Sequence, residues 1–70
     1  MTKEQAELIL TFAKCNMNRA QTAKTLFVHP TTVHYRIGLI KKEYGLDAEV
    51  FYDLCRLVVI ASSVAEVKGE

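Results

Sequence analysis

The chain has 70 residues, half of them apolar, with nine basic and eight acidic side chains and a formal net charge of +1. This length suffices for one small packed domain and leaves little room for a substrate cleft. No apolar run approaches the roughly 18 residues that span a bilayer, and the charged N-terminal segment lacks the apolar stretch of a signal peptide. We therefore expect a single cytoplasmic domain that makes no membrane contact.

The cysteines and histidines are not spaced for metal binding. Cys15 and Cys55 form no CxxC pair, and without an export signal two reduced thiols are expected. His29 and His34 are five residues apart, off the i,i+4 spacing that puts two imidazoles on one helix face. The sequence also has no glycine-rich phosphate loop. We predict no metal, no cofactor and no enzymatic activity.

Hydrophobic periodicity predicts four helices and no strand, which is an all-α fold with a central helix-turn-helix over residues 1–70. The first helix is expected at residues 3–14, where Thr2 and Gln5 have the spacing of a capping box. Its broad apolar face consists of Ala6, Leu8, Ile9, Phe12 and Ala13.

The second helix is expected at residues 19–26. Asn18 is placed to cap it, and Gln21 lies three residues on, where it can reciprocate. Three residues repeat at a spacing of three and are expected to point inward: Ala20, Ala23 and Leu26. The small side chain of Ala23 favours a close crossing by the next helix, as a helix-turn-helix requires.

The third helix is expected at residues 30–44. Pro30 suits its first position, His29 suits a cap or corner, and Gly45 suits the position just after its end. A helical wheel predicts a buried stripe of Val33, Ile37, Ile40 and Tyr44. The opposite face consists of Thr31, Tyr35, Gly38 and Lys42, with Thr32 and His34 on its flanks.

The fourth helix is expected at residues 48–67, with Asp47 as its cap. Its apolar stripe is predicted to contain Val50, Phe51, Leu54, Leu57, Val58, Ala61 and Ala65. Four further residues fall outside that stripe and form a possible partner face: Tyr52, Cys55, Val59 and Ile60. A helix that is apolar on more than one face either is wrapped by its own domain or meets a partner.

Charge is distributed unevenly along the chain. Residues 14–42 hold six basic side chains and no acidic one, whereas the rest of the chain holds three basic residues and all eight acids. The formal charge of residues 14–42 is thus +6 and that of the rest of the chain is −5, and the small net charge hides this asymmetry. A solvated surface is the simpler alternative, but the complete lack of acids favours a polyanionic partner.

The major groove of B-DNA admits one α-helix, and the second helix of a helix-turn-helix enters it with its N-terminal end. We therefore expect base contacts from Thr31, Thr32, His34 and Tyr35. Phosphate contacts are expected from Arg19, Gln21, Lys24, Arg36, Lys41 and Lys42. Two of these residues have a second interpretation. For Thr31 a role as a capping hydroxyl is equally open, and Arg36 can run along the surface to an acid such as Asp53.

The stretch from Thr22 to Ile37, TAKTLFVHPTTVHYRI, resembles the helix-turn-helix of PucR-type regulators. That family includes the sugar-diacid (CdaR-like) and purine-catabolism regulators of bacteria, and its motif reads approximately TA-x-x-L-x-V-H-x-N-T-V-x-Y-R-L. The corner and third helix are also similar to the DNA-binding end of Fis. The similarity continues through Gly45-Leu46-Asp47 and the apolar last helix, so it covers nearly the whole chain.

The resemblance implies a C-terminal DNA-binding domain of a larger transcription factor, placed after a separate sensory region. Three positions depart from the family pattern. Thr31 replaces the usual Asn, and Gly38 stands where a basic residue is common. Phe27 occupies the corner, where many helix-turn-helix proteins have Gly; because a bulky residue disfavours positive φ, we expect the turn to differ in detail.

Two functions are open on this sequence. The favoured one is sequence-specific binding of duplex DNA by a bacterial transcriptional regulator, with the third helix in the major groove. The alternative is a helical protein-interaction or dimerisation module that acts through the fourth helix. The two are compatible, because a single helix-turn-helix commonly needs a homodimer, or docking to the sensory domain of the same protein, to reach useful affinity.

Overall fold

Four helices make up most of the molecule, in a computed structural model that describes residues 1–68 and the side chains of residues 1–64. They are α1 (Lys3–Lys14), α2 (Arg19–Leu26), α3 (Pro30–Tyr44) and α4 (Phe51–Lys68). The described residues contain no strand, so the expected all-α fold is confirmed. The first three helices have the expected bounds, whereas α4 begins at Phe51 rather than at residue 48.

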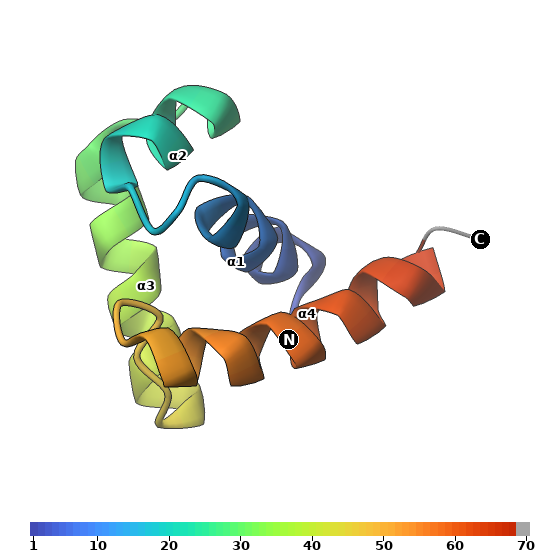
Figure 1. Cartoon of the computed structure of the whole chain (residues 1–70). Helices are drawn as coiled ribbons and strands as arrows, with labels where there is room; N and C mark the ends of the chain where they lie inside the picture. Colours follow the sequence, from blue (N-terminus) through green and yellow to red (C-terminus); the bar gives the residue numbers. More distant parts are fainter. Residues whose placement is uncertain (69–70) are drawn as a thin grey trace.

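Helix α1 occupies the centre of the molecule, with α2 and α3 on one side and α4 crossing it on the other (Figure 1). Its capping box is formed as predicted: the Thr2 hydroxyl accepts from the Gln5 N–H at 3.1 Å, and the Gln5 side chain accepts from the Thr2 N–H at 2.9 Å. Its inner face supplies Ala6, Leu8, Ile9 and Phe12 to the core. From the other helices the core receives Ala23, Val33, Ile37, Ile40, Leu54, Leu57 and Ala61.

Helix α2 begins at the predicted cap, since the Asn18 side chain accepts from the Gln21 N–H at 2.9 Å. The expected reciprocal bond from Gln21 is replaced by a bond from the Asn18 N–H to the Cys15 carbonyl oxygen at 3.1 Å. The inner face differs from the prediction, because Ala20 is exposed while Thr22 is fully buried.

The buried face of α2 is centred between Thr22 and Ala23, with Leu26 half-buried beside them. At 100° per residue, Ala20 then lies about 110° from that centre, which explains its exposure. The Thr22 hydroxyl donates to the Asn18 carbonyl oxygen at 2.8 Å. This bond satisfies the buried oxygen, so Thr22 is accommodated in the core at little cost.

The corner between α2 and α3 is a left-handed turn at Phe27, whose φ and ψ are 58° and 42°. The N–H of Phe27 donates to the Lys24 carbonyl oxygen and that of Val28 to the Ala23 carbonyl oxygen, at 3.3 and 2.9 Å. This bond pair is the Schellman pattern, which Gly usually closes. The expectation that a bulky residue would avoid positive φ is therefore wrong here, and Phe27 tolerates the conformation with 94% of its surface exposed.

Helix α3 has the predicted ends and the predicted inner face. The His29 side chain accepts from the Thr31 N–H at 3.1 Å, so His29 is the cap, and Gly45 closes the helix at φ 70°. Val33, Ile37 and Ile40 are buried and Tyr44 is half-buried. Helix α3 packs against α2, and its other side faces solvent along its length.

Asp47 caps a turn rather than α4. Its side chain accepts from the Glu49 N–H at 2.9 Å and its carbonyl oxygen accepts from the Val50 N–H at 2.9 Å. Asp53, in the first turn of α4, accepts from the Asp47 N–H at 3.1 Å. This turn buries Ala48 and delays the start of α4 to Phe51.

The buried and exposed residues of α4 only partly match the predicted buried stripe and partner face. Leu54, Leu57 and Ala61 are buried and Val58 is half-buried, as expected. Val50 and Phe51 were assigned to the buried stripe but are 46% and 62% exposed, because Val50 lies in the turn before α4 and Phe51 is the first residue of that helix. Ala65 lies outside the residues whose side chains are described. No helix among the described residues is long and apolar enough to cross a membrane.

Candidate nucleic-acid interface

The outer face of α3, together with the start of α2, forms the candidate interface. Of the four residues expected to contact bases, Thr31, His34 and Tyr35 are exposed and Thr32 is half-buried. Because His29 already caps the helix, the Thr31 hydroxyl is not its cap. Tyr35 is 65% exposed, so its ring does not pack into α2. The four side chains therefore share one accessible end of α3.

Arg19, at the start of α2, lies next to this face. Its Nη1 is 2.8 Å from Nδ1 of His34, and its Nε is 3.5 Å from a carboxylate oxygen of Glu49. Three segments that are distant in the sequence thus meet at one guanidinium. Gln21, two residues further along α2, is exposed.

Two more of the expected phosphate-binding cations have acidic neighbours. Arg36 lies 3.5 Å from a carboxylate oxygen of Glu4 on α1, and Lys41 lies 3.6 Å from one of Asp47. The acid beside Arg36 is thus Glu4, not the suggested Asp53. Exposed pairs of this kind contribute about 0–1 kcal/mol, so a phosphate can replace the carboxylate at little cost.

The remaining cations of the basic segment are Lys14, Lys24 and Lys42. Within the part of the chain whose side chains are described, no carboxylate lies within ion-pairing distance of any of them. Folding therefore neutralises half of the +6 segment with acids from outside it. Lys24 on α2 and Lys42 on α3 are exposed.

Sequence reasoning missed the acids at this surface. Glu4 and Glu49 lie in the segments flanking the basic stretch, where they were counted only as part of its acidic surroundings. Their pairing with Arg36 and Arg19 depends on how α1 and the turn before α4 pack beside α2 and α3. No local spacing signals either contact.

The cysteines and acids of the described residues give no metal centre. Cys15 and Cys55 are both free thiols. No group of three or more His, Cys, Asp or Glu side chains lies close enough together, over the described chain, to hold a metal ion.

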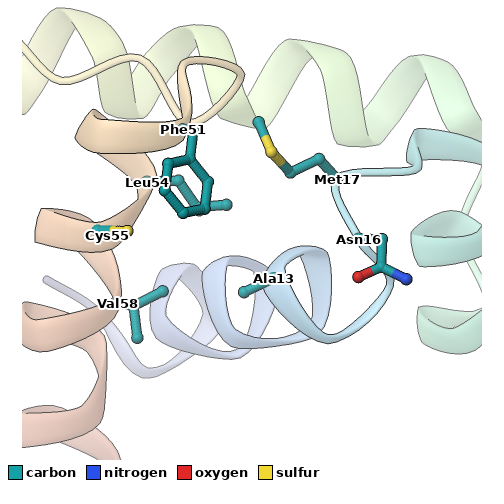
Figure 2. Close-up of a pocket in the computed structure, with 7 residues that line it drawn as sticks. All are labelled: Ala13, Asn16, Met17, Phe51, Leu54, Cys55 and Val58. Carbon is teal, nitrogen blue, oxygen red and sulfur yellow. The ribbon is translucent and has the colours of Figure 1, made fainter.

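A second candidate surface is an apolar groove of about 420 Å³ between α1 and the first turns of α4. Figure 2 shows Phe51, Cys55 and Val58 on the α4 side, with Met17 extending toward Phe51 from the loop after α1. The groove adjoins the predicted partner face, of which Tyr52, Cys55 and Val59 are exposed while Ile60 is half-buried. Phe51, which was expected in the buried stripe of the fourth helix, is 62% exposed in this groove.

A short helix, a tight left-handed corner and a longer helix that crosses close above it define a helix-turn-helix domain. The profile of the PucR C-terminal helix-turn-helix domain matches residues 5–60. This match covers most of the chain, and the protein belongs to that family. Comparison with curated proteins and with solved structures gave no match.

Proposed function

We propose that the domain binds duplex DNA as part of a bacterial transcriptional regulator, with α3 in the major groove. The observation that carries the proposal is the outer face of α3, which combines exposed hydroxyl, imidazole and phenol groups with cations on both flanks. Membership of the PucR C-terminal helix-turn-helix family supports the same function. No substrate cleft or metal chemistry is needed for it.

Phosphate binding is assigned to the cations around this face. Lys24 and Lys42 lie on α2 and α3 and are available without displacement of a carboxylate from the described residues. Arg19, Arg36 and Lys41 can exchange their carboxylates for phosphate, because each ion pair is at least partly exposed and therefore weak. The exposed Gln21 adds a neutral donor near the start of α2.

Base contacts are assigned to the N-terminal half of α3. The hydroxyls of Thr31 and Thr32 can donate to or accept from any base edge, and their methyl groups can contact the thymine methyl. His34 and Tyr35 follow on the same exposed side. Together they give a face with several modest contacts rather than one bidentate Arg–guanine contact.

A salt titration of binding to mixed-sequence duplex DNA tests the proposal, with the oligomeric state recorded alongside. We expect log K to fall with log salt at a slope of about −3 to −5, as several neutralised phosphates require. A forced dimer, made by fusion to a coiled coil, is the control for a monomer that binds too weakly to measure. Failure of a folded, forced dimer to bind would refute the proposal.

A second function, docking to a partner through α4, is favoured by the apolar groove and by three largely exposed side chains, Phe51, Tyr52 and Val59. The partner would be a second copy of the domain or a sensory domain of the same protein. Val59→Glu should abolish self-association while helicity is retained, because Val59 is 70% exposed. Sedimentation and circular dichroism measure the two properties; loss of helicity would instead assign Val59 to the core.

In the intact regulator, the two surfaces would act together. A homodimer formed through α4 would present two copies of α3 to two half-sites, which raises affinity over that of one copy. Such a regulator would work in the cytoplasm, where its DNA lies.

A further inference from the structure

Arg19 is held at two points by groups from different parts of the chain. Its Nε faces Glu49 at 3.5 Å and its Nη1 meets His34 Nδ1 at 2.8 Å. Glu49 is itself anchored, because its backbone N–H donates to Asp47 Oδ1 at 2.9 Å. The guanidinium is therefore oriented by its neighbours, unlike the side chain of Lys24, which has no such contacts among the described residues.

The contact with Arg19 determines which nitrogen of His34 carries the hydrogen. A guanidinium is always protonated and offers only donors, so His34 Nδ1 must accept and carry no hydrogen. In the neutral ring the hydrogen then resides on Nε2. Nε2 is thus a hydrogen-bond donor, and no other described residue takes that bond.

His34 is also the residue that borders both hollows on the outer side of α3. One hollow lies toward the start of α2 and includes Pro30 and Thr31 in its lining. The other lies toward the C-terminal half of α3 and includes Leu39 and Lys42. His34 therefore stands on an exposed ridge in the middle of the face to which DNA binding is assigned.

We infer that Arg19 is a positioning residue that fixes His34 as a donor, and that this donor reads a guanine in the major groove. Guanine presents two adjacent acceptors, N7 and O6, whereas cytosine presents only an amino donor. Adenine and thymine each present a single acceptor, beside an amino group or a methyl group. A histidine free to exchange tautomers would fit a donor or an acceptor edge, but one held by Arg19 fits acceptors only. The inference rests on the proposed DNA-binding function and names the base chemistry that the same face selects.

The tautomer can be measured on the free domain by ¹⁵N NMR of the histidine rings. We expect His34 to be the Nε2–H tautomer in the original chain and to become a mixture in Arg19→Lys, which keeps the charge but has a single ammonium in place of the guanidinium fork. Arg36→Lys is the matched control, since Arg36 contacts Glu4 and not His34. His29 is an internal reference, because its Nδ1 accepts from the Thr31 N–H whatever occupies position 19.

Base selection is measured by in vitro selection from a randomised duplex pool, followed by binding to the enriched site. We expect one guanine in each half-site whose replacement by 7-deazaguanine weakens binding about fivefold, the factor that one hydrogen bond supplies. His34→Ala and Arg19→Lys should lose this sensitivity, while Arg36→Lys should retain it. If Arg19→Lys weakened binding to all sequences equally and kept the sensitivity to 7-deazaguanine, Arg19 would act only through phosphate. That result would overturn the positioning role.

The two experiments separate failure of the inference from failure of the proposed function. If the domain enriched a site but His34 were the Nδ1–H tautomer, the positioning of His34 by Arg19 would be refuted and DNA recognition would not. A domain with the expected tautomer that enriches no sequence, even as a forced dimer, would refute DNA recognition and the guanine contact with it.

Discussion

The outer face of α3 and the outer face of α4 are both solvent-exposed, yet they expose different chemistry. Along α3 the exposed side chains are mostly polar or basic, with Leu39 as an apolar exception, and three neighbouring cations are matched by carboxylates. Along the described part of α4 the exposed large apolar side chains are Phe51, Tyr52 and Val59. Exposure of polar side chains to water carries no free-energy penalty, whereas burial of a cluster of apolar side chains by a partner is favourable. The two helices therefore suit partners of different chemistry.

The two faces also differ in how they respond to salt and to charge. Contacts with phosphate through α3 would weaken steeply as salt rises, because counterions compete for the DNA. Association through an apolar groove would change little, since burial of apolar surface has no counterion term. Measuring both properties on one sample would separate the two surfaces without any substitution.

The largest expected effect distinguishes the two sides of α4. Leu57→Ala should lower the free energy of unfolding by about 2–5 kcal/mol, because Leu57 is fully buried and its removal leaves a cavity. Val59→Ala, two residues along the same helix, should cost less than about 0.5 kcal/mol because Val59 is 70% exposed. Urea denaturation measures both; equal losses would mean that the two sides of α4 are not distinct.

The next largest effect is expected when two cations beside the outer face of α3 are reversed in charge. Lys24→Glu combined with Lys42→Glu should lower affinity for mixed-sequence DNA about 100-fold at low salt, because two phosphate contacts become repulsions. Self-association should be unchanged. Lys3→Glu combined with Arg56→Glu makes the same change in net charge outside the basic segment, and should reduce binding far less. An equal loss in the two variants would show that net charge, rather than the α3 face, controls binding.

A smaller effect concerns the two glycines that flank the second half of α3. Gly38→Ala should stabilise the fold by about 1 kcal/mol, because position 38 is helical and open space surrounds an added Cβ. Gly45→Ala should destabilise it by about 1 kcal/mol, because φ is +70° there. Thermal unfolding compares the two variants. Stabilisation by both changes would contradict the left-handed end of α3.

The smallest effect tests whether acids restrain the cations of the α3 face. Glu4→Gln should raise DNA affinity about threefold at low salt and make the salt slope steeper by about 1, because Arg36 is released for phosphate. Glu7→Gln removes a charge from the same helix without disturbing an ion pair of the described side chains, and supplies the control. Identical salt slopes for the two variants would mean that Arg36 does not reach the DNA.

Local signals were enough to predict most of the helices from the sequence. The Thr2–Gln5 capping box, the Asn18 and His29 caps and the Gly45 terminus all depend on bonds within a few residues, and each occurs as expected. The buried stripe of α3 was predicted for a similar reason. Its apolar residues recur at helical spacing, and on the opposite side mainly polar residues surround the single aliphatic side chain of Leu39.

Phe27 marks the limit of such local reasoning. Its side chain disfavours a left-handed backbone by about 1–2 kcal/mol, so local preference argued for a different turn. The chain nevertheless adopts φ 58° there, because that conformation makes the bonds from Phe27 and Val28 to the end of α2 and directs the half-buried Val28 toward the core. Packing on both sides of the corner outweighs the local preference.

By itself the sequence determined the helix-turn-helix, its caps and the segment that carries the basic charge, because each is encoded in residues close together along the chain. Tertiary structure alone decided which cations keep a carboxylate, since Glu4 and Glu49 meet their arginines only after α1 and the turn before α4 have packed. It likewise decided that Thr22 is buried and Phe51 exposed. The physical reason is that burial and ion pairing depend on which surfaces meet, and a helical period fixes only which residues share a side.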